Sequence, residues 1–274
     1  MRILNAFGWI VLYVVIYLLS TLVAGVGVAI GMVIVAIFQS ARDIAAEPDF
    51  FRLIAESINY IIIAASLLSL FFFWLVLLLR KKQPLEELDL TRRMAAGKWM
   101  AATLIGAGTA LALTGIMSLV NIERLLPEDA EMLSDFVSGN FLLSLVAIGL
   151  IIPLFEEVLF RGLILNELRK AMRIWPALLL QALIFAAFHL NLLQFIYTLP
   201  AGILLGLLYV RWGSLWAPIV VHVAWNSLVV CMNFFLPPLE QAHFWSMLAA
   251  GIVLLSLPLL FSLSRPSYSN GTLD

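Results

Sequence analysis

The chain has 274 residues, of which 63% are hydrophobic and 12% charged, and its formal net charge is -1. This composition and a mean hydropathy of +1.05 lie outside the balance of soluble domains, in which about a quarter of residues are charged, and they indicate a membrane protein. The near-neutral charge gives no reason to expect a nucleic acid as partner. The single cysteine, Cys231, excludes an intramolecular disulfide and a cysteine metal cluster, so we expect it to be a packing residue.

Helices of about 20 apolar residues cross a bilayer core of roughly 30 Å, and eight apolar runs of suitable size follow one another along the chain. We therefore expect an all-α, polytopic membrane helix bundle of about eight transmembrane helices in one membrane domain. The fifth run is short, and its boundary with the sixth is indistinct. The runs are residues 9–38, 58–79, 99–120, 141–165, 175–190, 192–210, 215–236 and 244–264.

Three segments at or near the ends of these runs need separate interpretation. The first run is too long for the apolar part of a signal peptide, so we expect it to stay as a membrane helix, with cleavage near Ala24 as the alternative. Residues 41–57 mix charges with apolar side chains and fit either an amphipathic helix on the outer interface or a solvated loop. Residues 265–274 are polar and are expected to form a disordered tail.

The distribution of lysine and arginine predicts the orientation, because these residues are enriched in cytoplasmic loops. The even-numbered connections between the eight runs carry most of them, with six in residues 80–98, three in residues 169–173, and Arg211. The odd-numbered connections contain only Arg42, Arg52 and Arg124. Both termini are therefore predicted to be cytoplasmic, and an odd number of spans would break the alternation.

Charged residues stand inside the fourth run, in the segment PLFEEVLFRG, where each costs about 2.5–3.5 kcal/mol at bilayer depth and so normally faces a protein interior. Glu157 and Arg161 are four positions apart and lie on one helical face, so we expect them to form a packing ion pair. Glu156 is rotated by about 100° and has no basic residue three or four positions away inside the run. Its carboxylate needs a proton, a metal, water or a distant histidine.

Two histidines of later runs can supply that partner. His189 ends the segment IFAAFH, one turn after Phe185, and His222 stands in VVHVAWN, one turn before Asn226. From the helix rise, Glu156 lies roughly 14 Å from the cytoplasmic end of its run, His222 and Asn226 roughly 10 to 17 Å, and His189 about 20 Å. We therefore expect these side chains to converge on a shared cavity, somewhat to the cytoplasmic side of the midplane.

The third histidine, His243, stands beside Trp245 in the last outer connection and is expected to be an interfacial residue.

A carboxylate with neutral imidazoles can hold and deprotonate a water molecule, either directly as a general base or around a divalent metal ion. Asn226 can donate a hydrogen bond to the oxyanion that forms when this water attacks an acyl carbon. The set of groups therefore points to peptide hydrolysis. Other hydrolytic chemistries lack support, because the chain has no HExxH pair, no aspartate in any predicted run, and no serine in a GxSxG setting.

The order EEVLFR, FAAFH and HVAWN resembles the EExxxR, FxxxH and HxxxN motifs of the CAAX protease and bacteriocin-processing family of intramembrane proteases, also called Abi or type II CAAX prenyl endopeptidases, over residues 141–233. The resemblance implies that Glu156 activates water with His189 as its partner. The implied catalytic set is Glu156, His189, His222 and Asn226. The implied supporting set is Glu157, Arg161 and Phe185.

The resemblance leaves two mechanisms open. In a metalloprotease, Glu156, His189 and His222 would coordinate Zn²⁺, whereas the same residues also fit a metal-free glutamate protease. On either interpretation residues 141–236 form the catalytic core, preceded by N-terminal helices in residues 1–140 and followed by a last helix and polar tail in residues 237–274.

The resemblance also implies a protein or peptide substrate, cleaved near a prenylated C-terminus or during the maturation of a small peptide. Such a substrate would approach from the cytoplasm or laterally through the lipid.

Two other classes of protein compete with the protease. A transporter or channel would use the glutamates and histidines as an ion or proton relay. It would need interrupted helices in corresponding halves of the chain, for which Pro153 and residues 200–206 are the candidates. A non-enzymatic scaffold or immunity protein could retain the protease fold, but the complete set of motifs argues against it.

Overall fold

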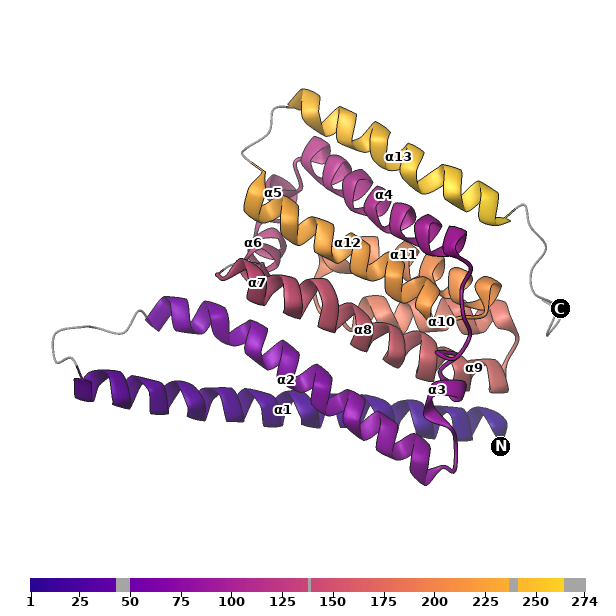
Figure 1. Cartoon of the computed structure of the whole chain (residues 1–274), viewed down its shortest axis with the longest axis horizontal. Coiled ribbons are helices and arrows are strands. Elements are labelled where there is room, and N and C mark those ends of the chain that lie inside the picture. The colour runs from indigo at the N-terminus through magenta and orange to yellow at the C-terminus, as the bar shows by residue number, and fades with distance from the viewer. Residues whose placement is uncertain (43–49, 138, 237–240, 264–274) are drawn as a thin grey trace.

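Helices account for 88% of the residues that the structure describes, which are 1–42, 50–137, 139–236 and 241–263, and no strand occurs among them. The structure is a computed structural model (Figure 1). Its elements are α1 Arg2–Arg42, α2 Phe50–Leu79, α3 Pro84–Glu87, α4 Ala96–Val120, α5 Ile122–Leu125, α6 Pro127–Phe136, α7 Phe141–Ser144, η1 Leu145–Ile151, α8 Ile152–Glu157, η2 Val158–Leu165, α9 Asn166–Ala171, α10 Ile174–Ala187, α11 Leu192–Trp212, α12 Trp216–Phe235 and α13 Gln241–Leu263.

Seven helical segments within these described ranges are long and apolar enough to cross a membrane, which confirms the expected polytopic all-α bundle. The protein is therefore an integral, multi-pass membrane protein. The seven segments are Arg2–Phe38, Ser57–Leu79, Ala96–Val120, Phe141–Ala171, Leu192–Trp212, Trp216–Phe235 and Ala242–Leu260. The eighth, α10, has 14 residues and is about 21 Å long, which is shorter than a bilayer core.

The boundary between α10 and α11 differs from the predicted one, because the fifth run does not stay helical up to residue 190. The helix ends at Ala187, and Leu190 takes a left-handed backbone conformation with φ of 51°. Asn191 then caps the next helix, since its side chain accepts a hydrogen bond of 2.8 Å from the backbone N–H of Gln194. His189 consequently lies in a turn rather than in a helix.

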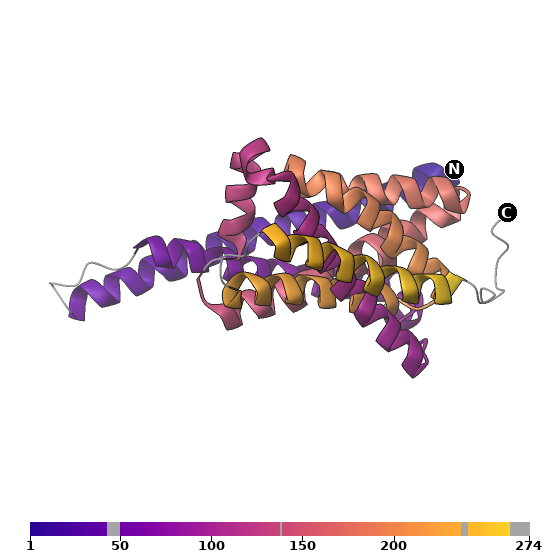
Figure 2. The same ribbon diagram turned by 90° about the horizontal axis from the view of Figure 1, so that it is seen from above.

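The connection between the first two spans also differs from both alternatives that we considered for residues 41–57. The first helix continues to Arg42 and the second begins at Phe50, so most of this segment prolongs the two membrane helices. Residues 43–49, like the predicted tail at residues 265–274, lie outside the described residues. Figures 1 and 2 show the far ends of α1 and α2 projecting from one end of the bundle.

The helical run Phe141–Ala171 passes through the middle of the bundle, with α1 and α2 on one side of it and α12 on the other (Figure 1). Beyond α12 follow α4 and then α13. The first residue of α1 and the last residue of α13 lie at the same end of the bundle (Figure 1), as an even number of crossings requires. Which side of the membrane this end faces stays a prediction.

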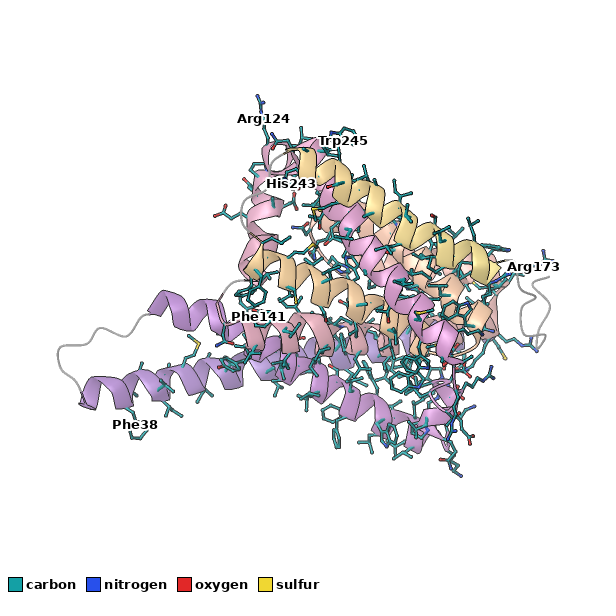
Figure 3. All side chains as sticks on the ribbon, turned by 45° about the horizontal axis from the view of Figure 1, so that its top comes forward. Phe38, Arg124, Phe141, Arg173, His243 and Trp245 are labelled. Atoms are coloured by element: carbon teal, nitrogen blue, oxygen red, sulfur yellow. The ribbon has the colours of Figure 1, made fainter. Side chains whose placement is uncertain are left out.

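Labelled side chains mark the two ends of the bundle in Figure 3. Arg173 lies at one end, whereas Arg124, His243 and Trp245 lie together at the other. His243 is exposed and stands in the first turn of α13, not in the connection before it. The separation of Arg173 from Arg124 agrees with their assignment to connections on opposite sides of the membrane.

Glycines let α4 approach its two neighbours closely. A Cβ atom added at Gly106 would lie 2.8 Å from the Cβ of Ala224 in α12. A Cβ atom at Gly108 would lie 2.6 Å from the backbone nitrogen of Leu255 and 2.8 Å from the carbonyl oxygen of Gly251, both in α13. Small residues at such crossings allow membrane helices to pack without a water-driven hydrophobic effect.

Gly108→Leu should therefore push α13 away from α4 and lower the free energy of unfolding by about 1–3 kcal/mol, since overpacking of a close contact costs this much. Unfolding in mixed detergent micelles measures the change. Gly27→Leu is the matched control, because no atom lies within 4 Å of a Cβ placed at Gly27 on α1. Equal stability of the two variants would contradict the role of Gly108.

Candidate active site

Two π-helical segments, η1 and η2, flank the short helix α8 that carries both glutamates. In η1 the N–H of Ile152 donates to the carbonyl of Ala147, five positions earlier. In this register the carbonyl of Ile148 would receive the N–H of residue 153, but Pro153 has none. Interruptions of this kind are frequent at functional sites of helical proteins.

Side chains of α12 compensate for the missing backbone donor. The Nδ2 group of Asn226 donates to the carbonyl oxygen of Ile148 at 3.1 Å, and the hydroxyl of Ser227 donates to the carbonyl oxygen of Gly149 at 3.2 Å. Unpaired backbone groups are costly in a bilayer, so these bonds stabilise the interrupted helix. They also fix α12 against the glutamate helix, which is α8 with its π-helical flanks η1 and η2. The contact lies two turns before Glu156.

Asn226→Ala should lower the free energy of unfolding by about 1–3 kcal/mol, because the carbonyl of Ile148 then has no donor. Asn233→Ala, on the exposed part of the same helix, should change it by less than about 0.5 kcal/mol. Unfolding of both purified variants in detergent micelles checks the difference. An asparagine that only stabilised a reaction intermediate would leave the stability of the first variant unchanged.

The ion pair of Glu157 and Arg161 lies in the centre of the bundle, where both side chains are fully buried. Nη1 of Arg161 donates to Oε1 of Glu157 at 2.8 Å, and Nη2 donates to the carbonyl oxygen of Gly202 in α11 at 3.3 Å. The guanidinium carbon stands 4.4 Å from the centre of the Phe185 ring, a cation–π contact. Arg161 thereby joins the glutamate helix to α10 and α11.

His222 lies between the two glutamates. Its Nδ1 donates to Oε1 of Glu157 at 2.7 Å, the same oxygen that Arg161 binds, and its Nε2 lies 3.7 Å from Oε2 of Glu156. A neutral histidine that donates from Nδ1 has its lone pair on Nε2, so the acceptor nitrogen faces Glu156. Local spacing in the sequence predicts only Arg161 as a partner of Glu157, because His222 is 65 positions away in the chain.

Glu156 differs from Glu157 in accessibility, since 15% of its side chain is exposed and that of Glu157 is fully buried. It forms no ion pair with Arg161 among the described contacts. Its charge nevertheless acts on Arg161 and on two tyrosine hydroxyls, those of Tyr17 in α1 and Tyr197 in α11. Glu156 is therefore the accessible carboxylate of the cluster.

The predicted pairing of Glu156 with His189 is not formed among the described residues, where His222 is the histidine next to Glu156. The Nδ1 atom of His189 lies 2.9 Å from the carbonyl oxygen of Phe185. The Phe185 ring is edge-on to both imidazoles, at 5.0 Å from His189 and 6.2 Å from His222. Because α10 ends at Ala187, His189 stands in the turn after the helix.

The predicted zinc ligands do not form a three-residue set in this arrangement. In the described part of the chain, no group of three or more His, Cys, Asp or Glu side chains is gathered closely enough to hold a metal ion. Glu156 and His222 are neighbours, but His189 stands apart from them and Oε1 of Glu157 already has two donors. Zinc binding stays a prediction.

Several residues near the site were not singled out in the sequence. Tyr17 and Tyr197 lie within the electrostatic influence of Glu156, and the ring of Trp225 lies 5.8 Å from that of His222. Ser227 directly follows Asn226, one position after the HVAWN motif. Tyr17 belongs to the first span, far outside the three motifs.

The fold and site define a class: a polytopic membrane protein whose buried Glu–Arg–His cluster leaves one glutamate accessible. Residues 138–228 match the model of the Rce1-like family, described as type II CAAX prenyl endopeptidase Rce1-like. This match confirms the resemblance that the motifs indicate, and it includes every predicted catalytic and supporting residue.

Three proteins are similar to parts of the chain. The "Putative membrane peptidase YdiL" of Bacillus subtilis (strain 168) is 27% identical over 106 residues, which cover 39% of this chain and 43% of YdiL. An "Uncharacterized 24.3 kDa protein" of Escherichia coli is 30% identical over 37% of this chain and 49% of its own length. The "Uncharacterized protein YpbD" of Bacillus subtilis (strain 168) is 27% identical over 48% of this chain and 70% of its own.

The matches thus span less than half the length of the first two relatives. No solved structure matches the chain significantly.

Proposed function

We propose that the protein is an intramembrane endopeptidase, which hydrolyses a peptide bond with a water molecule activated at Glu156. One observation carries the proposal: the accessible carboxylate of Glu156 faces Nε2 of His222, while the buried carboxylate of Glu157 binds Nδ1 of the same ring. The Rce1-like match and the likeness to a protein named as a membrane peptidase support a CAAX-type membrane peptidase.

The two acceptor atoms that face each other can hold a water molecule. Oε2 of Glu156 and Nε2 of His222 are 3.7 Å apart, so a water can donate one hydrogen to each and direct a lone pair of its oxygen at the substrate. When this oxygen attacks the carbonyl carbon, a C–O bond forms, the water proton moves to Glu156, and the carbonyl electron pair moves to oxygen. The C–N bond then breaks, and the leaving nitrogen takes the proton back from Glu156.

The negative oxygen of this intermediate needs a hydrogen-bond donor. The side-chain amide of Asn226 has two N–H groups, of which one is bound to Ile148. We assign the second to the oxyanion, because Asn226 follows His222 by one helical turn on the same face. The bond to Ile148 then also orients the amide before the substrate binds, as electrostatic preorganisation requires.

His189 is assigned to the substrate side of the site. Its Nε2 atom is directed away from the bond to Phe185, and catalytic hydrogen bonds often tighten only when the substrate is bound. We propose that, once a peptide lies between it and Glu156, Nε2 of His189 becomes a partner of the leaving nitrogen, while His222 stays the second partner of the attacking water.

The purified protein, reconstituted in vesicles with a library of membrane-anchored peptides, tests the proposal. His222→Ala and His189→Ala should each lower the cleavage rate by about 10²-fold or more, whereas His243→Ala, the exposed histidine at the end of the bundle, should cleave like wild type. Full activity of both site variants would overturn the proposal, as would solute flux without cleavage.

Treatment of the wild-type protein with a chelator, followed by addition of Zn²⁺, separates a metal-dependent peptidase from one that uses glutamate alone.

A further inference from the structure

The first helix, α1, buries a single stripe of residues against the bundle while the rest of its surface is largely exposed. The buried members follow one another at helical spacing and are Ala6, Ile10, Tyr13, Ser20 and Ala24. The half-buried Tyr17 lies on the same stripe, one turn after Tyr13. Two tyrosines and a serine thus face inward from the middle of a helix that is otherwise almost entirely apolar.

Packing and hydrogen bonding explain why Tyr13 faces inward. Its hydroxyl accepts a hydrogen bond of 2.7 Å from Arg80 at the end of α2, and Arg80 pairs with Glu167 of α9, also at 2.7 Å. The same guanidinium lies 3.9 Å above the ring of Trp9. This network fixes the position of α1 along α2 and α9, so the next inward residue, Tyr17, is held in a defined place.

Tyr17 touches both segments that bring chemical groups to the site. Its ring lies 5.1 Å from that of Phe155, which precedes Glu156, and 5.8 Å from that of Phe188, which precedes His189. The three rings form an aromatic cluster between the glutamate helix and the turn after α10. The cluster therefore borders the space that a peptide must occupy to reach Glu156 and His189 together.

The hydroxyl of Tyr17 lies near the depth of the Glu156 carboxylate. The start of α1 and the end of α9 lie at the same end of the bundle (Figure 1), and Tyr17 and Glu156 are each about 22 Å along the helical chain from these two ends. The hydroxyl of Tyr17 is within reach of the charge of Glu156, and the hydroxyl of Thr21 donates a hydrogen bond of 3.0 Å to the backbone carbonyl of Tyr17. The side chain of Tyr17 is partly buried, with an intermediate share of its surface exposed.

Ser20 supports the polar character of this stripe. Its side chain is 2% exposed, and its hydroxyl has no hydrogen-bond partner. A buried hydroxyl without a partner is uncommon in folded proteins. It stands one turn after Tyr17 on the face that borders the site.

We propose that Tyr17 is a substrate-contact residue, and that α1 forms the lipid-side wall of the active site. The partly exposed rings of Tyr17 and Phe188, backed by the buried ring of Phe155, contact an apolar side chain next to the scissile bond, and the hydroxyl of Tyr17 donates a hydrogen bond to the peptide backbone. The substrate class is a membrane-inserted peptide with a bulky apolar residue at that position. This inference rests on the proposed peptidase function.

Photo-crosslinking tests the contact without turnover. A photoreactive phenylalanine analogue replaces Tyr17 in the Glu156→Gln variant, which is reconstituted with a biotin-labelled library of membrane-anchored peptides. Tyr60 is the matched control position, because it is a tyrosine on α2 whose side chain is 50% exposed. We expect peptide crosslinks from position 17 and not from position 60; crosslinks to lipid alone at both positions would overturn the proposal.

Steady-state cleavage by otherwise wild-type protein supplies the second measurement. Tyr17→Ala should raise KM about tenfold with kcat changed less than about threefold, since a lost apolar contact weakens binding by this order, and Tyr17→Phe should show a smaller rise. Tyr60→Ala should behave like wild type. A fall in kcat at constant KM would mean that Tyr17 only supports the fold of the site and would overturn the contact.

The two measurements fail separately. Peptide crosslinks from position 17 without cleavage by the wild-type protein would contradict the proposed peptidase function. Cleavage without such crosslinks would contradict the proposed role of Tyr17 and α1 as a wall of the active site.

Discussion

Glu156→Gln should abolish peptide cleavage, with a rate about 10²–10⁴-fold below that of wild type, because an amide cannot accept the proton of the attacking water. The replacement keeps the size of the side chain and its hydrogen-bonding oxygen. Since Glu156 forms no close ion pair with Arg161, the folded structure should not depend on its charge. The cleavage rate in reconstituted vesicles and the unfolding midpoint of the same preparation measure the two effects.

Glu86→Gln is the control for this experiment. Glu86 is exposed in the connection after α2, outside the membrane spans, so its loss should leave both the cleavage rate and the unfolding midpoint unchanged. An active Glu156→Gln variant would exclude Glu156 as the base. A variant that fails to fold would instead show that its charge is needed for structure, and would contradict its assignment as the free carboxylate.

Local spacing in the sequence predicted the contact between Glu157 and Arg161, because residues four apart in a helix are neighbours whatever surrounds them. The contact between Glu157 and His222 could not be predicted in this way. It depends on how α12 lies against α8, which the bonds of Asn226 and Ser227 to the interrupted helix determine. The role of Glu157 as partner of His222 is therefore visible only in the three-dimensional structure.

The position of His189 could not be predicted from the local sequence pattern either. Hydropathy continues through Phe188 to Leu190, so the pattern predicted helix up to residue 190. The capping side chain of Asn191 and the left-handed backbone of Leu190 end the helix earlier, and neither changes the hydropathy of the run. The predicted depth of His189 was therefore based on a helix that does not extend so far, and its contact with Glu156 is absent.

The role of α1 was left open by the motifs but was partly visible in the sequence. Tyr13, Tyr17 and Ser20 recur at helical spacing in an apolar run, and polar residues in membrane helices generally face the protein interior. The pattern predicts which face of α1 is buried. It does not predict the contact of Tyr17 with the rings of Phe155 and Phe188. That contact depends on how α1 packs against the glutamate helix.

Glu157→Gln should cause the largest loss of stability, with the free energy of unfolding falling by about 3–5 kcal/mol, because it removes the partner of a fully buried guanidinium. Arg161 would keep only the carbonyl of Gly202, the Phe185 ring and the more distant charge of Glu156. Unfolding in mixed detergent micelles measures the change. Arg92→Met, which removes an exposed ion pair with Asp89, should cost less than about 1 kcal/mol.

Arg161→Met should cost less than Glu157→Gln, although both break the same ion pair. Glu157 keeps a second partner in His222, whereas Arg161 has no second carboxylate in direct contact among the described residues. The double variant should therefore be more stable than Glu157→Gln alone, because the uncompensated charge is gone. Equal losses of unfolding free energy in the two single variants would show that His222 and Arg161 do not compete for Glu157. Additive losses in the double variant would show that the three residues do not act as one unit.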